Sequence, residues 1–96
     1  METLRKKEKP RDAAEKERLT KRLSRLAGQI EGIRRMVEDD RYCGDILLQL
    51  SAAEGALREI ANSVYETHML TCVKDKIRQG DDSALLESFE LLRRLK

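Results

Sequence analysis

Residues 19–37 read LTKRLSRLAGQIEGIRRMV, and the apolar pattern of this stretch decides the fold. Its large apolar residues recur at alternating steps of four and three positions: Leu19, Leu23, Leu26, Ile30, Ile33 and Val37. This spacing is typical of the buried stripe of a helix that packs in a bundle. It predicts a first helix over residues 13–38, followed by a tight acidic turn.

The same stepping resumes after the turn, at Ile46, Leu50, Ala53, Leu57, Ile60 and Val64. Because no proline interrupts it, we predict a second helix over residues 42–78, with Gly80 as its stop. Asp81, Asp82 and Ser83 then offer an N-cap for a short third helix over residues 84–95. The chain is therefore predicted to be all-α.

The composition leaves little apolar material for a core, since 40% of the 96 residues are charged and the chain has one Phe, two Tyr and no Trp. Copies that share apolar faces would bury more surface, so we expect an oligomer. Residues 1–12 carry Pro10 and no apolar period, which predicts a flexible basic tail before a single helical domain over residues 13–96.

Neither the start of the chain nor any later stretch resembles a signal peptide or a run of about 18 apolar residues. We therefore expect a cytoplasmic protein without membrane contacts. In a reducing compartment its two cysteines are expected to be free thiols.

Positive charge is concentrated near the N-terminus, where residues 1–35 hold 12 Lys/Arg against 6 Asp/Glu. On the predicted first helix Arg18, Arg22 and Arg25 share an arc of about 60°, and Lys21 lies alongside. Such a face can bind DNA phosphates, and an ordinary solvated face with mixed ion pairs is the alternative. Further positive charge toward the turn comes from Arg34, Arg35 and Arg41.

The single histidine and both cysteines share one face of the predicted second helix. At about 100° per residue, His68 and Cys72 each point within about 20° of Cys43. Along a continuous helix Cys43 lies roughly 37 Å from His68, so one chain cannot close a site from all three. If two copies of this helix pack antiparallel, Cys43 of one meets His68 and Cys72 of the other, and two equivalent sites form.

Two thiolates and one imidazole suit a soft ion of low coordination number, and Cu(I) is the best match, since a closed structural zinc site needs four ligands. Buried free cysteine is also a common small hydrophobic residue, and a single histidine near a seam is commonly a core or surface residue. A thiol enzyme with Cys72 activated by His68 is disfavoured, because no oxyanion-stabilising turn or third orienting residue is visible. A helical adaptor, and a stress sensor that links Cys43 to Cys72 of a neighbour, remain alternatives.

Two further residues have positions from which they could orient such ligands. Tyr42 adjoins Cys43, and Glu87 stands near the start of the predicted third helix. The alternative roles, away from any metal site, are ordinary packing for Tyr42 and a solvated acid for Glu87.

Three motifs resemble the CsoR/RcnR superfamily of bacterial metal-sensing repressors, over about residues 15–95. They are R-L-x-R-L-x-G-Q-I-x-G-I at 22–33, Y-C-x-D-I-L-x-Q at 42–49 and H-x-x-x-C at 68–72. Nickel and cobalt sensors of the superfamily carry histidine where Cys72 stands, formaldehyde sensors lack the second thiol, and persulfide sensors lack the histidine. The chain is therefore most similar to the copper-sensing branch.

That resemblance implies one Cu(I) per subunit, held by Cys43 of one subunit and by His68 and Cys72 of another, with Tyr42 and Glu87 supporting the ligands. It implies a three-helix subunit, an antiparallel four-helix-bundle dimer and a dimer-of-dimers tetramer. The implied function is a repressor, not an enzyme, that binds operator DNA without metal and releases it with Cu(I), so that copper-efflux genes are expressed. No small-molecule substrate is expected. The resemblance supports Arg22 as a DNA contact, with Lys16, Arg18 and Arg41 as further candidates.

Overall fold

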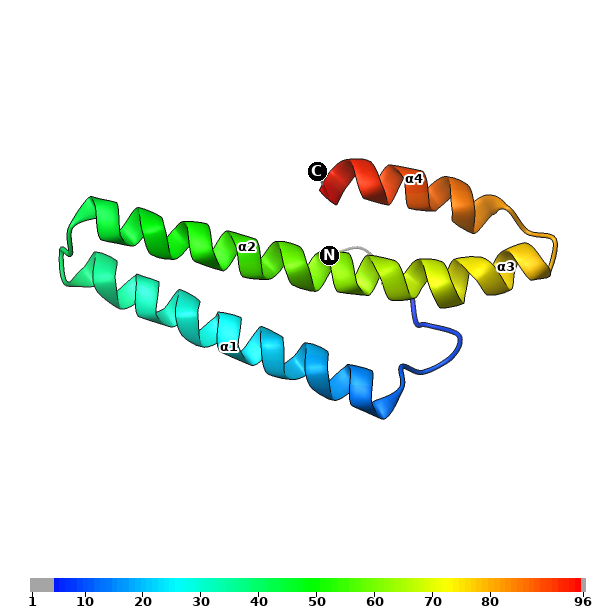
Figure 1. The fold of residues 1–96 in the computed structure, drawn as a ribbon, viewed down its shortest axis with the longest axis horizontal. Coiled ribbons are helices and arrows are strands. Elements are labelled where there is room, and N and C mark those ends of the chain that lie inside the picture. The colour runs from blue at the N-terminus through cyan, green and yellow to red at the C-terminus, as the bar shows by residue number, and fades with distance from the viewer. Residues whose placement is uncertain (1–4, 96) are drawn as a thin grey trace.

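The computed structural model describes residues 5–95, and every regular element within them is helical. Figure 1 shows α1 and α2 as an antiparallel hairpin, with α3 continuing the line of α2 and α4 folded back beside it. The predicted all-α class is confirmed. Residues 1–4 of the predicted tail and Lys96 at the end of the predicted domain lie outside the described residues. The elements are α1 (Ala13–Glu38), α2 (Cys43–His68), the π-helical segment η1 (Met69–Val73), α3 (Lys74–Arg78) and α4 (Ser83–Leu95).

The first and third predicted helices agree with the structure to within one residue. The second differs in kind, because its regular α-helical part ends at His68 and the next five residues widen into the π-turn η1 before α3 resumes. Apolar spacing could not reveal this change, since the pattern of buried positions continues across it.

The two connections are tight turns that use left-handed backbone. Asp40 has φ 53° after α1, and Gly80 has φ 82° after α3, a conformation that costs glycine little. Before α4, the carboxylate of Asp81 accepts hydrogen bonds from the backbone N–H of Ser83 at 2.9 Å and from its hydroxyl at 2.6 Å. The first amide of α4 is therefore satisfied by Asp81, one residue before the N-cap position, through an Asx-type turn.

The apolar seam divides into two rows with a spacing of seven residues. One row is buried where α1 packs on α2: Leu19, Leu26 and Ile33 against Ala53 and Ile60. The alternate row is open, with Ile30, Leu50 and Leu57 at 54%, 46% and 54% exposure. Leu23 and Val37 belong to this open row as well. The single chain therefore covers only half of its bundle seam.

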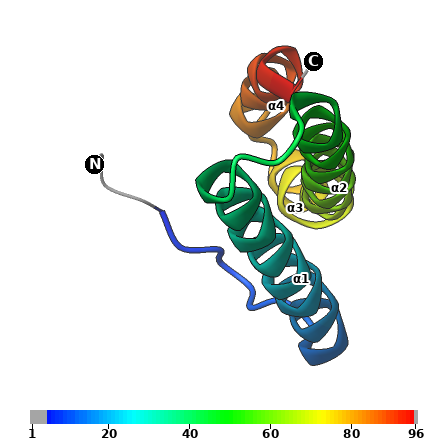
Figure 2. The same ribbon diagram turned by 90° about the vertical axis from the view of Figure 1, so that its left-hand side faces the viewer.

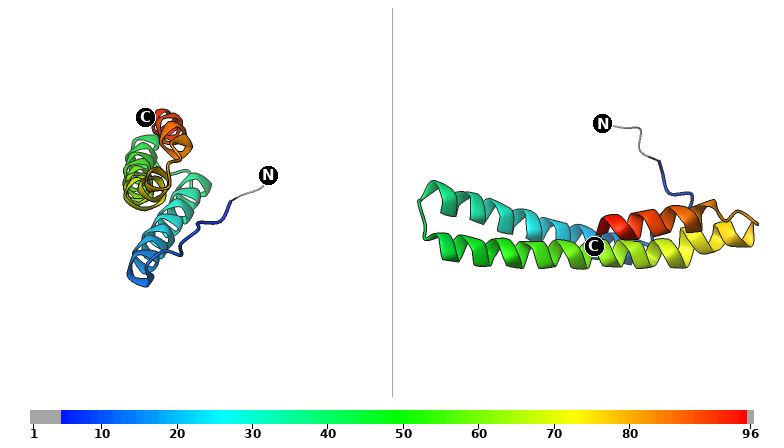
Figure 3. Two further views of the ribbon diagram at one scale, coloured as in Figure 1. Left: turned by 90° about the vertical axis from the view of Figure 1, so that its right-hand side faces the viewer. Right: turned by 90° about the horizontal axis from the view of Figure 1, so that it is seen from above.

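The molecule is elongated, with extents of 56 × 29 × 24 Å. Figure 2, which views it end-on, shows α1 and α4 apart from one another, each beside the rod that α2 and α3 form. The view from above in Figure 3 shows this rod extending along the whole length. Nowhere in residues 5–95 does a helix combine the length and the apolar character that crossing a membrane requires.

Candidate metal centre and nucleic-acid interface

His68 and Cys72 come together at the junction of α2 and η1. His68 is the last residue of α2 and Cys72 lies one turn later inside η1, and both are partly buried. The Nε2 atom of His68 is buried and has no hydrogen-bond partner among the described residues. A buried polar atom without a partner is costly, so this nitrogen is available to a ligand.

Helix α4 supports the junction from one side. Here η1 packs on α4, and Val73 of η1 and Ser88 of α4 are buried at 1% and 0% exposure. The hydroxyl of Tyr65 donates to the carbonyl oxygen of Ser88 at 3.3 Å, which links α2 to α4. A serine with no exposed surface marks close approach of the two elements, because a larger side chain would not fit.

The N-terminal tail covers the other side of the junction. The ammonium of Lys7 donates to the Cys72 sulfur at 3.3 Å and to the Thr71 hydroxyl at 3.2 Å. Further along, Lys9 pairs with Asp75 at 3.2 Å. Sequence reasoning missed these contacts, because ion pairs between distant residues produce no local period.

Glu87 lies on α4, and its carboxylate is paired with the N-terminal tail. Arg5 donates to both carboxylate oxygens of Glu87, at 2.6 and 3.3 Å. This hydrogen bond is the main cause that lowers the pKa of Glu87; partial burial of the carboxylate opposes it, and the positive charge of Arg5 lowers the pKa further. Glu87 therefore carries its negative charge at neutral pH.

The third predicted ligand is at the far end of α2. Cys43 is the first residue of that helix and is exposed. Tyr42 beside it is 76% exposed, and its ring folds over Gly44, where a Cβ would lie 2.5 Å from a ring carbon. Within residues 5–95 of one chain, no three histidine, cysteine or acidic side chains form a group that could hold a metal.

The residues predicted to bind DNA are all exposed. Arg22 and Arg25 line a hollow between α1 and α2 together with Glu59. Arg18, Arg22 and Arg25 form no ion pair within the described part of the chain, whereas Lys21 pairs with Glu17 at 3.0 Å. The full set is Lys16, Arg18, Lys21, Arg22 and Arg25 on α1, with Arg41 in the turn after it.

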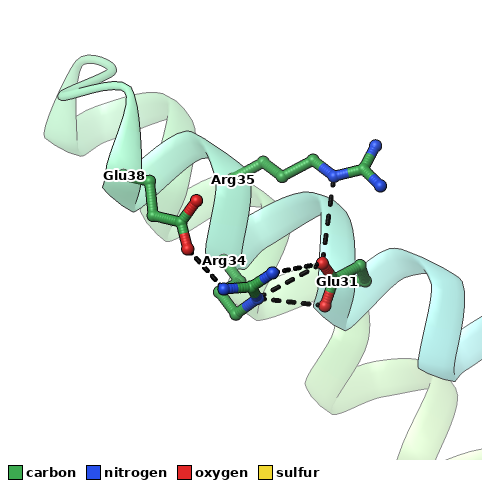
Figure 4. A network of polar contacts seen from close by, with 4 residues as sticks. All are labelled: Glu31, Arg34, Arg35 and Glu38. Atoms are coloured by element: carbon green, nitrogen blue, oxygen red, sulfur yellow. Dashed lines mark hydrogen bonds and ion pairs between the residues drawn. The ribbon is translucent and has the colours of Figure 1, made fainter.

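The end of α1 is less positive than its arginine content indicates. Arg34 donates to Glu31 at 2.7 Å and also pairs with Glu38, and Arg35 lies 3.8 Å from Glu31 (Figure 4). The hydrogen bond from Arg34 lowers the pKa of Glu31, so this carboxylate stays charged at neutral pH. The uncompensated positive charge is therefore centred on Arg18, Arg22 and Arg25.

The fold of the chain is a helical hairpin that carries exposed basic residues and a histidine–cysteine pair, features that a metal-sensing DNA-binding regulator needs. The sequence profile of the family described as "Metal-sensitive transcriptional repressor" matches residues 15–94. The chain belongs to this family of metal-sensitive transcriptional repressors. It is accordingly a regulator and not an enzyme, as the sequence predicted.

Two relatives with assigned functions match over most of their length. The copper-sensing transcriptional repressor CsoR of Bacillus subtilis (strain 168) is 44% identical over 84 residues, which cover 83% of each chain. The copper-sensing transcriptional repressor RicR of Mycobacterium tuberculosis (strain ATCC 25618 / H37Rv) is 39% identical and covers 84% of this chain and 88% of its own.

Two solved structures have the same fold. The copper-sensing repressor CsoR with Cu(I) from Geobacillus thermodenitrificans NG80-2 aligns with a TM-score of 0.85 at 42% identity, covering 88% of this chain and 90% of that chain. The nickel-responsive transcriptional regulator InrS aligns with a TM-score of 0.72 at 32% identity, covering 94% of this chain and all of its own.

Proposed function

We propose that this protein is a copper(I)-responsive transcriptional repressor, which binds operator DNA in the metal-free form and releases it when Cu(I) binds. The observation that carries the proposal is the buried, unpartnered Nε2 of His68, one turn from the Cys72 thiol. A soft cation at this position would satisfy the nitrogen and use the sulfur as well. Similarity to relatives named copper-sensing repressors supports the same metal.

The donor set favours Cu(I) over nickel. Two cysteine sulfurs and one imidazole are soft ligands in a number that suits Cu(I), whereas square-planar Ni(II) prefers more nitrogen and oxygen donors. Nickel would need a fourth ligand, and the described residues offer no further histidine, since the chain has only one. The similarity to InrS at 32% identity therefore supports the fold, and the ligands support copper.

Each site takes its third ligand from a second copy of the chain. Cys43 precedes Leu50 by seven residues and Leu57 by fourteen, so its thiol extends the open apolar row of α2. A second copy that covers this row in the antiparallel sense brings its own His68 and Cys72 to Cys43. Tyr42 then lies at the same site and, with Glu87, orients the ligands, giving one Cu(I) per subunit.

The same pairing produces the antiparallel four-helix-bundle dimer, and two dimers form the tetramer. The open row of Leu23, Ile30, Val37, Leu50 and Leu57 is the surface that dimerisation buries. Residues 13–96 are then one helical metal-sensing and DNA-binding domain, in a cytoplasmic protein. The described part of the basic tail, residues 5–12, lies against the sensor end through the contacts of Lys7 and Lys9.

DNA binds to the basic face of α1, where Arg22 is the central contact and Lys16, Arg18, Lys21, Arg25 and Arg41 extend the surface. In a tetramer the copies of this face form a long positive surface for phosphates. Cu(I) favours the tetramer conformation that binds DNA weakly. A coupling free energy of about 1–3 kcal/mol would change operator affinity roughly 5- to 150-fold.

Mixed subunits test the shared site directly. Cys43→Ala and Cys72→Ala each lack one ligand at every site, so each variant alone should lose tight Cu(I) binding. A dimer of one Cys43→Ala and one Cys72→Ala subunit retains one complete site, so unfolding and refolding the two together should restore up to half of the sites in each mixed dimer. A competition titration with a chromophoric Cu(I) chelator under anaerobic conditions counts them. No recovery on mixing would refute the shared site.

The release of operator DNA by Cu(I) is tested by a separate binding measurement. Operator affinity of the wild-type protein is measured at one fixed salt concentration with and without stoichiometric Cu(I), and with Ni(II) as the control metal. The expected result is weaker binding with Cu(I) alone. Equal affinity in all three conditions would end the claim.

A further inference from the structure

The helix between His68 and Cys72 is not a regular α-helix. In a regular helix four residues turn about 400°, so Cys72 would point about 40° past His68. Both residues of this pair border or belong to the π-turn η1, whose wider turns rotate each residue less and bring the two side chains nearer to one line. The interactions that hold this wide turn therefore determine the relative direction of the Cys72 and His68 side chains.

Thr71 makes the hydrogen bonds that hold the turn from inside. Its hydroxyl donates to the carbonyl oxygen of Thr67 at 2.7 Å and accepts from Lys7 at 3.2 Å. The Cys72 sulfur is 3.7 Å from the same oxygen, so the single hydroxyl proton is used by the carbonyl and not by the sulfur. A threonine bonded to the carbonyl four residues before it is known to bend helices.

The side of η1 that faces α4 is held by packing. Val73 is 1% exposed, and η1 packs on α4, where Ser88 is fully buried. Within residues 5–95, Thr71 is the one member of η1 whose side chain hydrogen-bonds to the backbone. Packing fixes the turn against α4, and the Thr71 hydroxyl fixes the part that carries Cys72.

We propose that Thr71 is a positioning residue for the metal site, which holds the π-turn in the form that presents Cys72 and His68 to one soft metal ion. This inference rests on the proposed function. The hydrogen bond alone does not produce a π-turn, because Thr20 makes the same bond to the carbonyl of Lys16 at 2.9 Å within the regular helix α1. Thr20 is therefore the matched control for loss of the same bond away from the ligands.

Three variants distinguish the effect of the Thr71 hydroxyl from that of its methyl group and from that of a similar bond elsewhere in the chain. Thr71→Val removes the hydroxyl at nearly constant shape, Thr71→Ser keeps the hydroxyl and removes the methyl group, and Thr20→Val removes the control bond. Cu(I) affinity is measured by anaerobic competition with a chromophoric chelator, and amide hydrogen exchange of residues 69–73 is measured without metal. Far-UV circular dichroism and thermal unfolding establish that each variant is folded, and Thr71→Ala replaces Thr71→Val if the latter is not.

The expected result is a fall in Cu(I) affinity of about 10-fold for Thr71→Val, as for other residues that orient metal ligands. Amide exchange in η1 should be faster in the same variant, whereas Thr71→Ser and Thr20→Val should bind Cu(I) like the wild type. Wild-type affinity in Thr71→Val, or an equal loss in Thr71→Ser, would overturn the inference and leave the proposed function standing. Failure of the wild-type protein to bind Cu(I) would overturn both.

Discussion

Leu57→Ala measures whether a second copy covers the open apolar row. Leu57 is 54% exposed in the single chain, whereas Leu26 in the buried row is 6% exposed. Full burial of a leucine contributes about 1.5–3 kcal/mol, so in a chain that acts alone roughly 1 kcal/mol depends on Leu57. If a second copy covers the row, the substitution leaves a cavity in a core, and the expected cost rises to about 2–5 kcal/mol per subunit, as for Leu26→Ala.

Urea unfolding followed by far-UV circular dichroism gives the free energy of unfolding of the wild type and both variants. Glu54→Ala on the exposed surface of α2 is the control, and we expect it to cost less than about 1 kcal/mol. The wild-type midpoint should also rise with protein concentration, because the second copy acts as a ligand of the folded chain. A cost near that of Glu54→Ala together with a concentration-independent midpoint would refute the covered row and the shared site built on it.

Three further expectations concern other parts of the molecule. Arg22→Ala should weaken operator binding and reduce the slope of log affinity against log salt by about one for each contacting copy, and an unchanged slope in a salt series would exclude Arg22 as a phosphate contact. Ser88→Val adds bulk at a position with no exposed surface and should destabilise the chain by about 1–3 kcal/mol in urea, whereas an unchanged midpoint would show that α4 can move aside. Because the pKa of Glu31 is lowered by Arg34, the stability from this pair is present above the ordinary carboxyl pKa and is lost as pH falls through the lowered one. The difference in melting temperature between wild type and Arg34→Ala should therefore shrink from neutral pH to strongly acidic pH, and a constant difference would contradict the pairing.

The helices were predictable because the information for them is local. Apolar residues at steps of three and four indicate a helix whatever the tertiary fold. The acidic turn after α1 and Gly80 before α4 indicate where helices end, so the limits of α1 and α4 agree with prediction to within one residue. The π-turn at Met69–Val73 was not predictable. The burial of Val73 where η1 packs on α4 and the hydrogen bonds of Thr71 accompany this turn, and they involve residues far apart in sequence or a hydroxyl whose partner the spacing does not reveal.

The candidate site was predictable only in part. The shared face of Cys43, His68 and Cys72 follows from the period of a helix, and the separation of Cys43 from the other two follows from its length. The contact of Lys7 with Cys72 and that of Arg5 with Glu87 were missed, because charge pairing has no period. The assignment of Cys43 to the site stays a prediction, which the mixed-subunit titration tests.

By itself the amino-acid sequence determined that the chain is helical, where α1 and α4 begin and end to within one residue, and which residues lie on the apolar seam. Only the tertiary structure decided which half of that seam is buried, that the Nε2 atom of His68 is buried without a hydrogen-bond partner among residues 5–95, and that the helix widens beside Cys72. The reason is physical: helical periodicity depends on residues within a turn or two, whereas burial and the partner of a polar atom depend on what the rest of the chain places against it.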